Sequence, residues 1–261
     1  MALEQPCDIG VVFALGAEQG CTEDLLGDLQ FIEAAGVPIR IGQLNGRSIV
    51  LATSGPGAVA AANACRMLLD VHRPQWLISA GFCGGLQPEL RRNDIVAATE
   101  FVDRPELSAP LAEALSKAAA AGIPAPHHQG RIAGVPRIVA RSADKRLLGE
   151  STGALACEME SAAVVEVCAE RNRPCLVLRV VSDPVDEDLP PDLEPLMSAK
   201  STARMLGAVV GALWRRPAGA KDLWQLKENA LLAADALAKH LREVMLRLPL
   251  EPRMSDALAR D

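Results

Sequence analysis

Two acidic residues in the stretch 155–183 occupy positions where the surrounding pattern is apolar. Glu160 begins the apolar face of a predicted helix, and its neighbours on that face are Ala163, Val164 and Val167. Burying an unpaired carboxylate costs roughly several kcal/mol, so we expect Glu160 to face a polar cavity or a hydrogen-bonding ligand. The alternative is a helix N-terminal acid that the helix dipole stabilises. Glu158, by contrast, is predicted to share a face with Glu166.

The second acid, Asp183, follows an apolar stretch that predicts a buried strand. Residues 175–181 show no alternation, which is typical of a parallel strand covered on both faces, and only Arg179 interrupts them. Ligands of open α/β sheets bind beyond the carboxyl ends of strands, and Ser182 and Asp183 lie there. Asp183 also precedes Pro184, a common turn signal, so a role as a turn residue is equally open.

A third acid, Glu18, lies just past another predicted strand. Residues 9–15 form a short apolar run that ends at Gly16. Glu18 is therefore expected at the same edge of the sheet as Asp183. Without further information, an exposed loop glutamate is the more frequent case.

The motifs E-M-E-S-A-A at residues 158–163 and R-V-V-S-D at residues 179–183 resemble the nucleoside phosphorylase and nucleosidase superfamily. The closest branch is the methylthioadenosine/adenosylhomocysteine nucleosidases. The resemblance implies that Glu160, with Met159, binds ribose hydroxyls and that Asp183 protonates the purine. It also implies that Arg179 lies near the attacking water and that Glu18 activates this water.

A glycine-rich motif extends the resemblance. Residues 81–86, G-F-C-G-G-L, match a G-x-x-G-G-L loop of the superfamily. Members that use phosphate usually carry Ser or Thr after the first glycine, where this chain has Phe82, and an Arg shortly before it, where this chain has residues 78–80, I-S-A. Phosphate needs charge-assisted donors, so these departures favour water as the nucleophile.

A departure at the expected base site leaves the identity of the base open. Where nucleosidases usually hold a phenylalanine that stacks on adenine, this chain has Pro136, Arg137 and Ile138. The resemblance thus assigns catalysis to Asp183, Glu18 and Arg179. It assigns substrate binding to Glu160, Met159, Gly84, Phe82, Ile138 and Ser182.

The composition restricts the partners. The chain of 261 residues has a net charge of -6 and no polybasic run, which argues against nucleic acid and anionic membranes as partners. Seven scattered cysteines without a C-x-x-C pair are typical of buried thiols in a reducing compartment. Neither a signal peptide nor a long apolar span is recognised, so a cytoplasmic protein is expected. Adjacent His127 and His128 predict a surface loop rather than a metal site, and no cofactor is expected.

Apolar periodicity and turn residues predict an α/β fold. We expect one three-layer α/β/α domain around a mixed, mostly parallel sheet. Helices are expected at residues 22–35, 58–71, 110–121, 142–149, 196–214 and 222–246. Strands are expected at residues 9–15, 76–80 and 175–181, with a strand pair or bent strand at 130–140, and a hairpin of residues 39–44 and 48–53 turns at Asn45 and Gly46.

The C-terminal region is predicted to extend beyond the family domain. The proposed boundary separates residues 1–214 from a helical extension, residues 215–261. An apolar stripe along residues 222–246 either packs back on the domain or contacts another subunit, so a homodimer or larger homo-oligomer is expected. The acidic, proline-rich residues 184–195 predict a flexible loop over the site.

The leading hypothesis for function is hydrolysis of the N-glycosidic bond of a purine nucleoside of the adenosine type. This reaction needs an acid for the leaving base, a base for water and a group that binds ribose, which Asp183, Glu18 and Glu160 supply. A phosphate-dependent phosphorylase is the alternative enzyme. A catalytically inactive nucleoside-binding protein is the alternative from another class.

Overall fold

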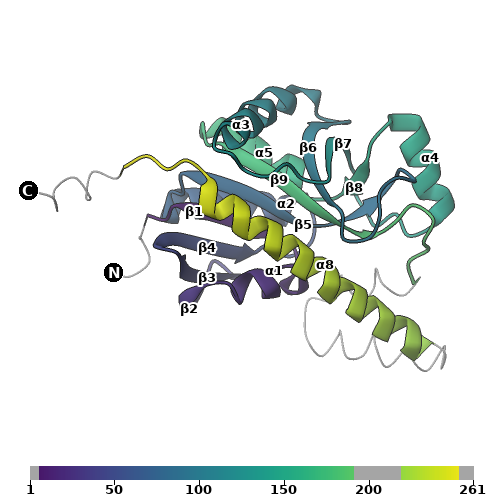
Figure 1. Ribbon diagram of the computed structural model, residues 1–261, viewed down its shortest axis with the longest axis horizontal. Coiled ribbons are helices and arrows are strands. Elements are labelled where there is room, and N and C mark those ends of the chain that lie inside the picture. The colour runs from purple at the N-terminus through teal and green to yellow at the C-terminus, as the bar shows by residue number, and fades with distance from the viewer. Residues whose placement is uncertain (1–5, 191–218, 253–261) are drawn as a thin grey trace, which may run out of the picture.

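The computed structural model describes residues 6–190 and 219–252, which form an α/β fold around a mixed sheet (Figure 1). The nine strands within these residues run in the order β2-β3-β4-β1-β5-β8-β7-β6-β9. They are β1 (Ile9–Phe13), β2 (Gly27–Ala34), β3 (Val37–Leu44), β4 (Arg47–Thr53), β5 (Trp76–Gly85), β6 (Ile95–Phe101), β7 (His128–Gly134), β8 (Ala156–Glu158) and β9 (Cys175–Asp183). Because β5 also pairs with β9, strands β5 to β9 close on themselves.

Strand β5 connects the two parts of this sheet. It pairs in parallel with β1 and β9, and its last residues pair antiparallel with β8, where Gly84 faces Cys157. The glycine-rich residues 81–85 were expected to form a loop, and this expectation is wrong, because the β9 and β8 ladders hold them in extended conformation. The strand thereby brings Gly84 next to Asp183, its partner in the β9 ladder.

Helices cover the sheet from both sides. They are α1 (Gly16–Glu23), α2 (Ala58–Met67), α3 (Ser108–Ala120), α4 (Ser142–Thr152), α5 (Ser161–Glu170) and α8 (Gly219–Arg247), with a π-helical turn η1 (Leu68–His72) and a 3-10 turn η2 (Pro105–Leu107). Successive strand residues alternate between two apolar cores: Val12 packs with residues of α2 and α5, and Val11 packs with residues of α8. Both faces of β1, β5 and β9 are buried, which explains why their sequences show no polar alternation.

Several sequence expectations are confirmed. The hairpin of β3 and β4 turns at Asn45 and Gly46, whose φ angles of 49° and 78° are those that a type I′ turn requires. Helices α2 with η1, α3 and α4 lie where helices were expected. Of the expected strand pair at residues 130–140, only β7 forms, and residues 135–141 are neither helix nor strand.

The expected helix at residues 22–35 is wrong. The chain forms the short helix α1 and then strand β2, which pairs antiparallel with β3 through a turn at Ala35 and Gly36. Both turn residues have positive φ, at 52° and 77°. The leucine spacing resembles a helical stripe, but the ladder with β3, which begins directly after the Ala35–Gly36 turn, overrides it.

Helix α8 packs back on the sheet, the first of the two arrangements that its apolar stripe allowed. Leu237, Leu241 and Val244 are buried against β1, β5 and β9. Figure 1 shows α8 crossing the sheet and extending past it at the N-terminal end of the helix. Leu231 belongs to the apolar stripe predicted along residues 222–246, but it is 52% exposed. The expected helix 196–214 and the boundary at residue 214 lie outside the described residues.

Leu241→Ala tests this packing. The side chain is 0% exposed in the core between α8 and the sheet, so the substitution should lower the free energy of unfolding by about 2–5 kcal/mol. Leu231→Ala on the exposed face is the matched control, with an expected change within about 0.5 kcal/mol. Urea unfolding monitored by circular dichroism measures both, and equal small effects would contradict the packing of α8.

Candidate functional site

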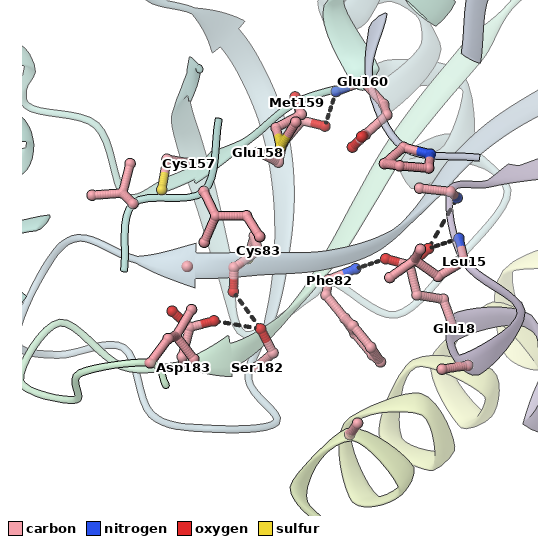
Figure 2. Close-up of a pocket in the computed structure, with 18 of the residues that line it drawn as sticks. Leu15, Glu18, Phe82, Cys83, Cys157, Glu158, Met159, Glu160, Ser182 and Asp183 are labelled. Carbon is pink, nitrogen blue, oxygen red and sulfur yellow. Dashed lines mark hydrogen bonds between the residues drawn. The ribbon is translucent and has the colours of Figure 1, made fainter. Parts of the chain in front are cut away.

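A cavity of about 250 Å³ lies at the carboxyl ends of β5 and β9. Eight of the nine candidate site residues line it: Glu18, Phe82, Gly84, Ile138, Met159, Glu160, Ser182 and Asp183. Figure 2 shows the three acids among them arriving from separate segments of the chain. Most of the remaining wall is apolar, with Leu15, Val135 and Val139 on the domain side and Leu226 and Ala230 from α8. Arg179 is the candidate that does not line the cavity.

Asp183 ends β9 and is 5% exposed. The Ser182 hydroxyl lies 2.5 Å from its Oδ1, and the Lys145 ammonium lies 2.6 Å from its Oδ2. A Cβ atom on Gly84 would lie 3.2 Å from Oδ2, so the glycine leaves room beside the carboxyl group. Burial raises the pKa of Asp183 above its ordinary value, although the Lys145 charge acts in the opposite direction. The group is thus able to keep a proton at higher pH than an exposed aspartate.

Glu160 directly precedes α5, so the expectation that it lies inside the helix is wrong. Its Oε1 accepts a hydrogen bond of 2.7 Å from the backbone N–H of Gly57, in the turn that leads into α2. Burial raises the pKa of Glu160 to about 7, against the lowering effect of Arg179 and with a further raising effect of Glu158. The expected apolar helix face does exist, since Val164 and Val167 are buried.

Glu158 is a functional candidate that the sequence analysis missed. It is the last residue of β8 and is 5% exposed, so the expectation that it shares a helix face with Glu166 is wrong. Its Oε2 accepts hydrogen bonds from the backbone N–H groups of Glu160 and Ser161, at 2.9 and 2.8 Å. Glu158 therefore satisfies the free N–H groups at the start of α5. The sequence analysis had considered Glu160 for this role of a helix N-terminal acid. The helical period misled the assignment, because the chain is extended as far as residue 158.

Arg179 lies beneath the cavity and is 1% exposed. Its Nη2 pairs with Oε2 of Glu158 at 2.6 Å, and its Nε donates to the Ser161 hydroxyl at 3.1 Å. A Cβ atom on Gly81 would collide with Nη1 of Arg179 and lie 2.7 Å from Oε1 of Glu18. Glycine at position 81 therefore allows the guanidinium and the Glu18 carboxylate to approach the same point of β5.

Glu18 lies in the first turn of α1 and is 3% exposed, so the interpretation as an exposed loop residue is wrong. Its Oε2 accepts from the N–H groups of Ala14 and Leu15, at 2.9 and 2.8 Å. Its Oε1 accepts from the N–H of Phe82 at 2.8 Å (Figure 2). Burial raises the pKa of Glu18, and Arg179 and these N–H groups lower it. Its carboxylate thus joins the end of β1 to β5.

Lys145 is the second residue that the sequence analysis missed. It lies on α4, is 0% exposed, and forms the ion pair with Asp183. In the sequence it has the spacing of an ordinary helix lysine, and only its position four residues before the buried Gly149 hints at an inward face.

Histidines lie apart from the cavity. His128 begins β7 with its Nε2 3.0 Å from Oδ2 of Asp94, and Nδ1 of His127 accepts the N–H of Ile95 at 2.8 Å. The two rings therefore have separate structural partners. Across residues 6–190 and 219–252, no set of three His, Cys, Asp or Glu side chains is arranged to hold a metal ion. No helix in these ranges is long and apolar enough to cross a membrane.

Two curated relatives carry the name 5′-methylthioadenosine/S-adenosylhomocysteine nucleosidase. The protein of Shewanella loihica is 29% identical over 207 residues, which is 71% of this chain and 90% of the relative. The protein of Tolumonas auensis is 26% identical over 228 residues, covering 78% and 99%. The solved nucleosidase of Neisseria meningitidis has a TM-score of 0.65 at 23% identity, covers 91% of this chain and 98% of its own, and shows a shared fold.

The sequence profile of one family matches most of the chain. The profile describes the phosphorylase superfamily and matches residues 8–213, a range that contains all nine candidate site residues. The superfamily resemblance of the E-M-E, R-V-V-S-D and glycine-rich motifs is thereby confirmed. The chain belongs to the phosphorylase superfamily.

Proposed function

We propose that the protein hydrolyses the N-glycosidic bond of an adenosine-type purine nucleoside, with or without a 5′ modification. The observation that carries this proposal is that Glu18, Glu160 and Asp183, from three separate segments, line one buried cavity. The names of the two curated relatives agree with it. Glu158 also lines this cavity, and four buried acids in a mostly apolar wall are difficult to explain as a packing arrangement, because each one resists burial.

In the proposed reaction, Asp183 donates its proton to a ring nitrogen of the purine. The C–N bond breaks, and its electron pair leaves with the base. Glu18 accepts a proton from water, whose oxygen forms the new C–O bond with ribose, and Glu160 accepts hydrogen bonds from ribose hydroxyls. The products are the free purine and a ribosyl product that carries a new hydroxyl group. The raised pKa of Asp183 suits this role, since the acid must hold its proton until the bond breaks.

The charge distribution around the cavity supports water rather than phosphate as the nucleophile. None of the described residues that line the cavity is a lysine or an arginine. Arg179 is buried beneath it and paired with Glu158, and Lys145 is paired with Asp183. Binding of a phosphate dianion needs cationic donors that are free to reach it.

The domain organisation, the oligomeric state and the cellular location of the protein are part of the same proposal. Helices on both sides of the sheet support a single three-layer domain, with residues 215–261 as a helical addition to residues 1–214. Exposed Trp224 and Leu232 on α8 support a homodimer or larger homo-oligomer. The six cysteines from Cys21 to Cys175 are free thiols, and five of them are buried, which supports a cytoplasmic location.

A nucleoside panel tests the reaction class. Purified protein should release free base from at least one adenosine-type nucleoside at the same rate with and without inorganic phosphate. Chromatography of the products should detect the free sugar rather than the sugar 1-phosphate. Base release that depends on phosphate would identify a phosphorylase, and tight binding without release would identify an inactive nucleoside-binding protein.

Asp183→Asn should lower kcat on the best substrate by about 10² to 10⁴, because the amide keeps the shape but has no proton to transfer. The dissociation constant for the same nucleoside should change little. Stopped-time assays and equilibrium binding measure the two quantities. Asp70→Asn, on the exposed surface of η1, is the control for the substitution itself. A variant that keeps most of the wild-type rate would make Asp183 a turn residue.

Glu160→Gln should raise KM roughly tenfold or more, because a hydrogen bond to a charged group contributes about 1.5–3 kcal/mol. Since the pKa of Glu160 is raised to about 7, its ionised form increases as the pH rises through neutrality. Wild-type KM should therefore fall between about pH 6 and about pH 8, and the Gln variant should lose this dependence.

Glu166→Gln is the matched control, because Glu166 lies on α5, which Glu160 directly precedes, but is paired with Arg104 away from the cavity. Its KM should follow the wild-type pH dependence. The role of Glu160 in ribose binding would be refuted by a Glu160→Gln variant with the same KM and the same pH dependence as the wild type.

A further inference from the structure

Lys145 is a fully buried cation that the proposed reaction does not use directly. Its Nζ has three partners, which match the three N–H bonds of an ammonium group. Oδ2 of Asp183 lies at 2.6 Å, the carbonyl oxygen of Pro184 at 3.1 Å and the carbonyl oxygen of Glu187 at 2.8 Å. Every donor of the group is therefore satisfied without water, and the side chain has one defined position.

All three partners belong to one short segment, residues 183–187. A buried lysine is strongly unfavourable unless a charge and hydrogen bonds compensate it, and this segment supplies both. Helix α4 thereby holds the end of β9 through a single side chain. Ser142, at the start of the same helix, adds a backbone N–H bond of 2.6 Å to Oδ1 of Asp188. Among these contacts, the ion pair of Lys145 is the one that reaches the carboxyl group of Asp183.

We infer that Lys145 is the positioning residue for the acid: it holds Oδ2 of Asp183, so that the transferable proton resides on Oδ1. This inference rests on the proposed function. An ammonium group only donates hydrogen bonds, so the oxygen that faces it cannot direct a proton toward it. Oδ1 remains for the proton, because the Ser182 hydroxyl that lies 2.5 Å from it can donate instead to the carbonyl oxygen of Cys83 at 3.2 Å. When the proton passes to the purine, the carboxylate that remains lies against a fixed positive charge, which stabilises the product of the transfer.

The groups around Asp183 come from four elements. Lys145 faces it from α4, Cys83 from β5, Cys157 from β8 and Glu187 from the segment after β9. The thiols are neutral, since burial raises the pKa of Cys83 well above its usual value and that of Cys157 to about 12. Lys145 is thus the one cation among the groups named, and it opposes the effects of burial and of Glu187 on the pKa of Asp183.

Arg92 provides a matched control, because it contacts the same segment from another part of the chain. Its guanidinium donates to the carbonyl oxygen of Ser182 and pairs with the carboxylate of Glu187. It therefore anchors both ends of the segment from another part of the chain, but it makes no hydrogen bond or ion pair with the Asp183 carboxyl group. A purely structural role for Lys145 predicts equal consequences for Lys145→Met and Arg92→Met.

The test measures kcat and KM against pH on the best substrate of the nucleoside panel. Lys145→Met should lower kcat about 10- to 100-fold with a smaller change in KM, because the acid is misplaced and its carboxylate is less stabilised. Without the lysine, burial raises the pKa of Asp183 unopposed, so the proton is retained to higher pH and the alkaline limb of the kcat profile moves upward. Lys145→Arg, which keeps the charge, should restore the position of the limb.

Arg92→Met should lower kcat without moving the alkaline limb. If the limb stays in place in Lys145→Met, or moves equally in both variants, Lys145 is a structural anchor and the inference is wrong.

A second measurement does not depend on turnover. Urea unfolding of Lys145→Met, Asp183→Asn and the double variant forms a double-mutant cycle. The double variant should lose less stability than the sum of the two single variants, since each single variant leaves the other group buried and unpaired. Additive losses would overturn the pairing. If the cycle shows coupling but no nucleoside is cleaved, the ion pair is confirmed and the proposed function is wrong.

Discussion

The buried ion pair between Glu158 and Arg179 is the interaction on which the arrangement of the candidate site depends. It joins the end of β8 to the middle of β9, and the same Glu158 oxygen accepts the first N–H groups of α5. The start of α5 in turn fixes Glu160, and Arg179 also lies beside Glu18 at Gly81. Breaking a buried pair leaves an uncompensated charge, so this network permits only one relative placement of the strands and the helix.

Desolvation is the second constraint, and it acts in the same direction on Glu18, Glu160 and Asp183. Glu18, Glu160 and Asp183 each have a raised pKa, with burial as the largest cause. Their partners then differentiate them. Glu18 is held by three backbone N–H groups, Glu160 by one, and Asp183 by an ammonium and a hydroxyl. One cavity therefore contains acids that share the effect of burial but have different hydrogen-bond partners.

The C-terminal helix links the fold to the cavity. Its buried face completes the core on one side of the sheet, and Leu226, Asn229 and Ala230 near its N-terminal end form part of the cavity wall. Its C-terminal end is attached through the carbonyl oxygens of Met245 and Leu248, which accept from Arg47 at 2.9 and 2.7 Å. The same element thus contributes to stability and shapes the space available to a substrate.

The sequence by itself determined the features that depend on local pattern: the buried strands β1 and β9, the Asn45–Gly46 hairpin, the superfamily, and the polar residues that end each strand. It placed Glu18 and Asp183 correctly because parallel strands present their carboxyl ends at a common edge. Tertiary structure alone decided the rest. Strand β2 replaced a helix because it pairs with β3 across the Ala35–Gly36 turn, and the leucine spacing alone does not reveal this pairing. Glu158 and Lys145 acquired their roles from charges that lie far away along the chain. A charged residue looks like a surface residue in a sequence, and only the fold reveals the opposite charge that allows its burial.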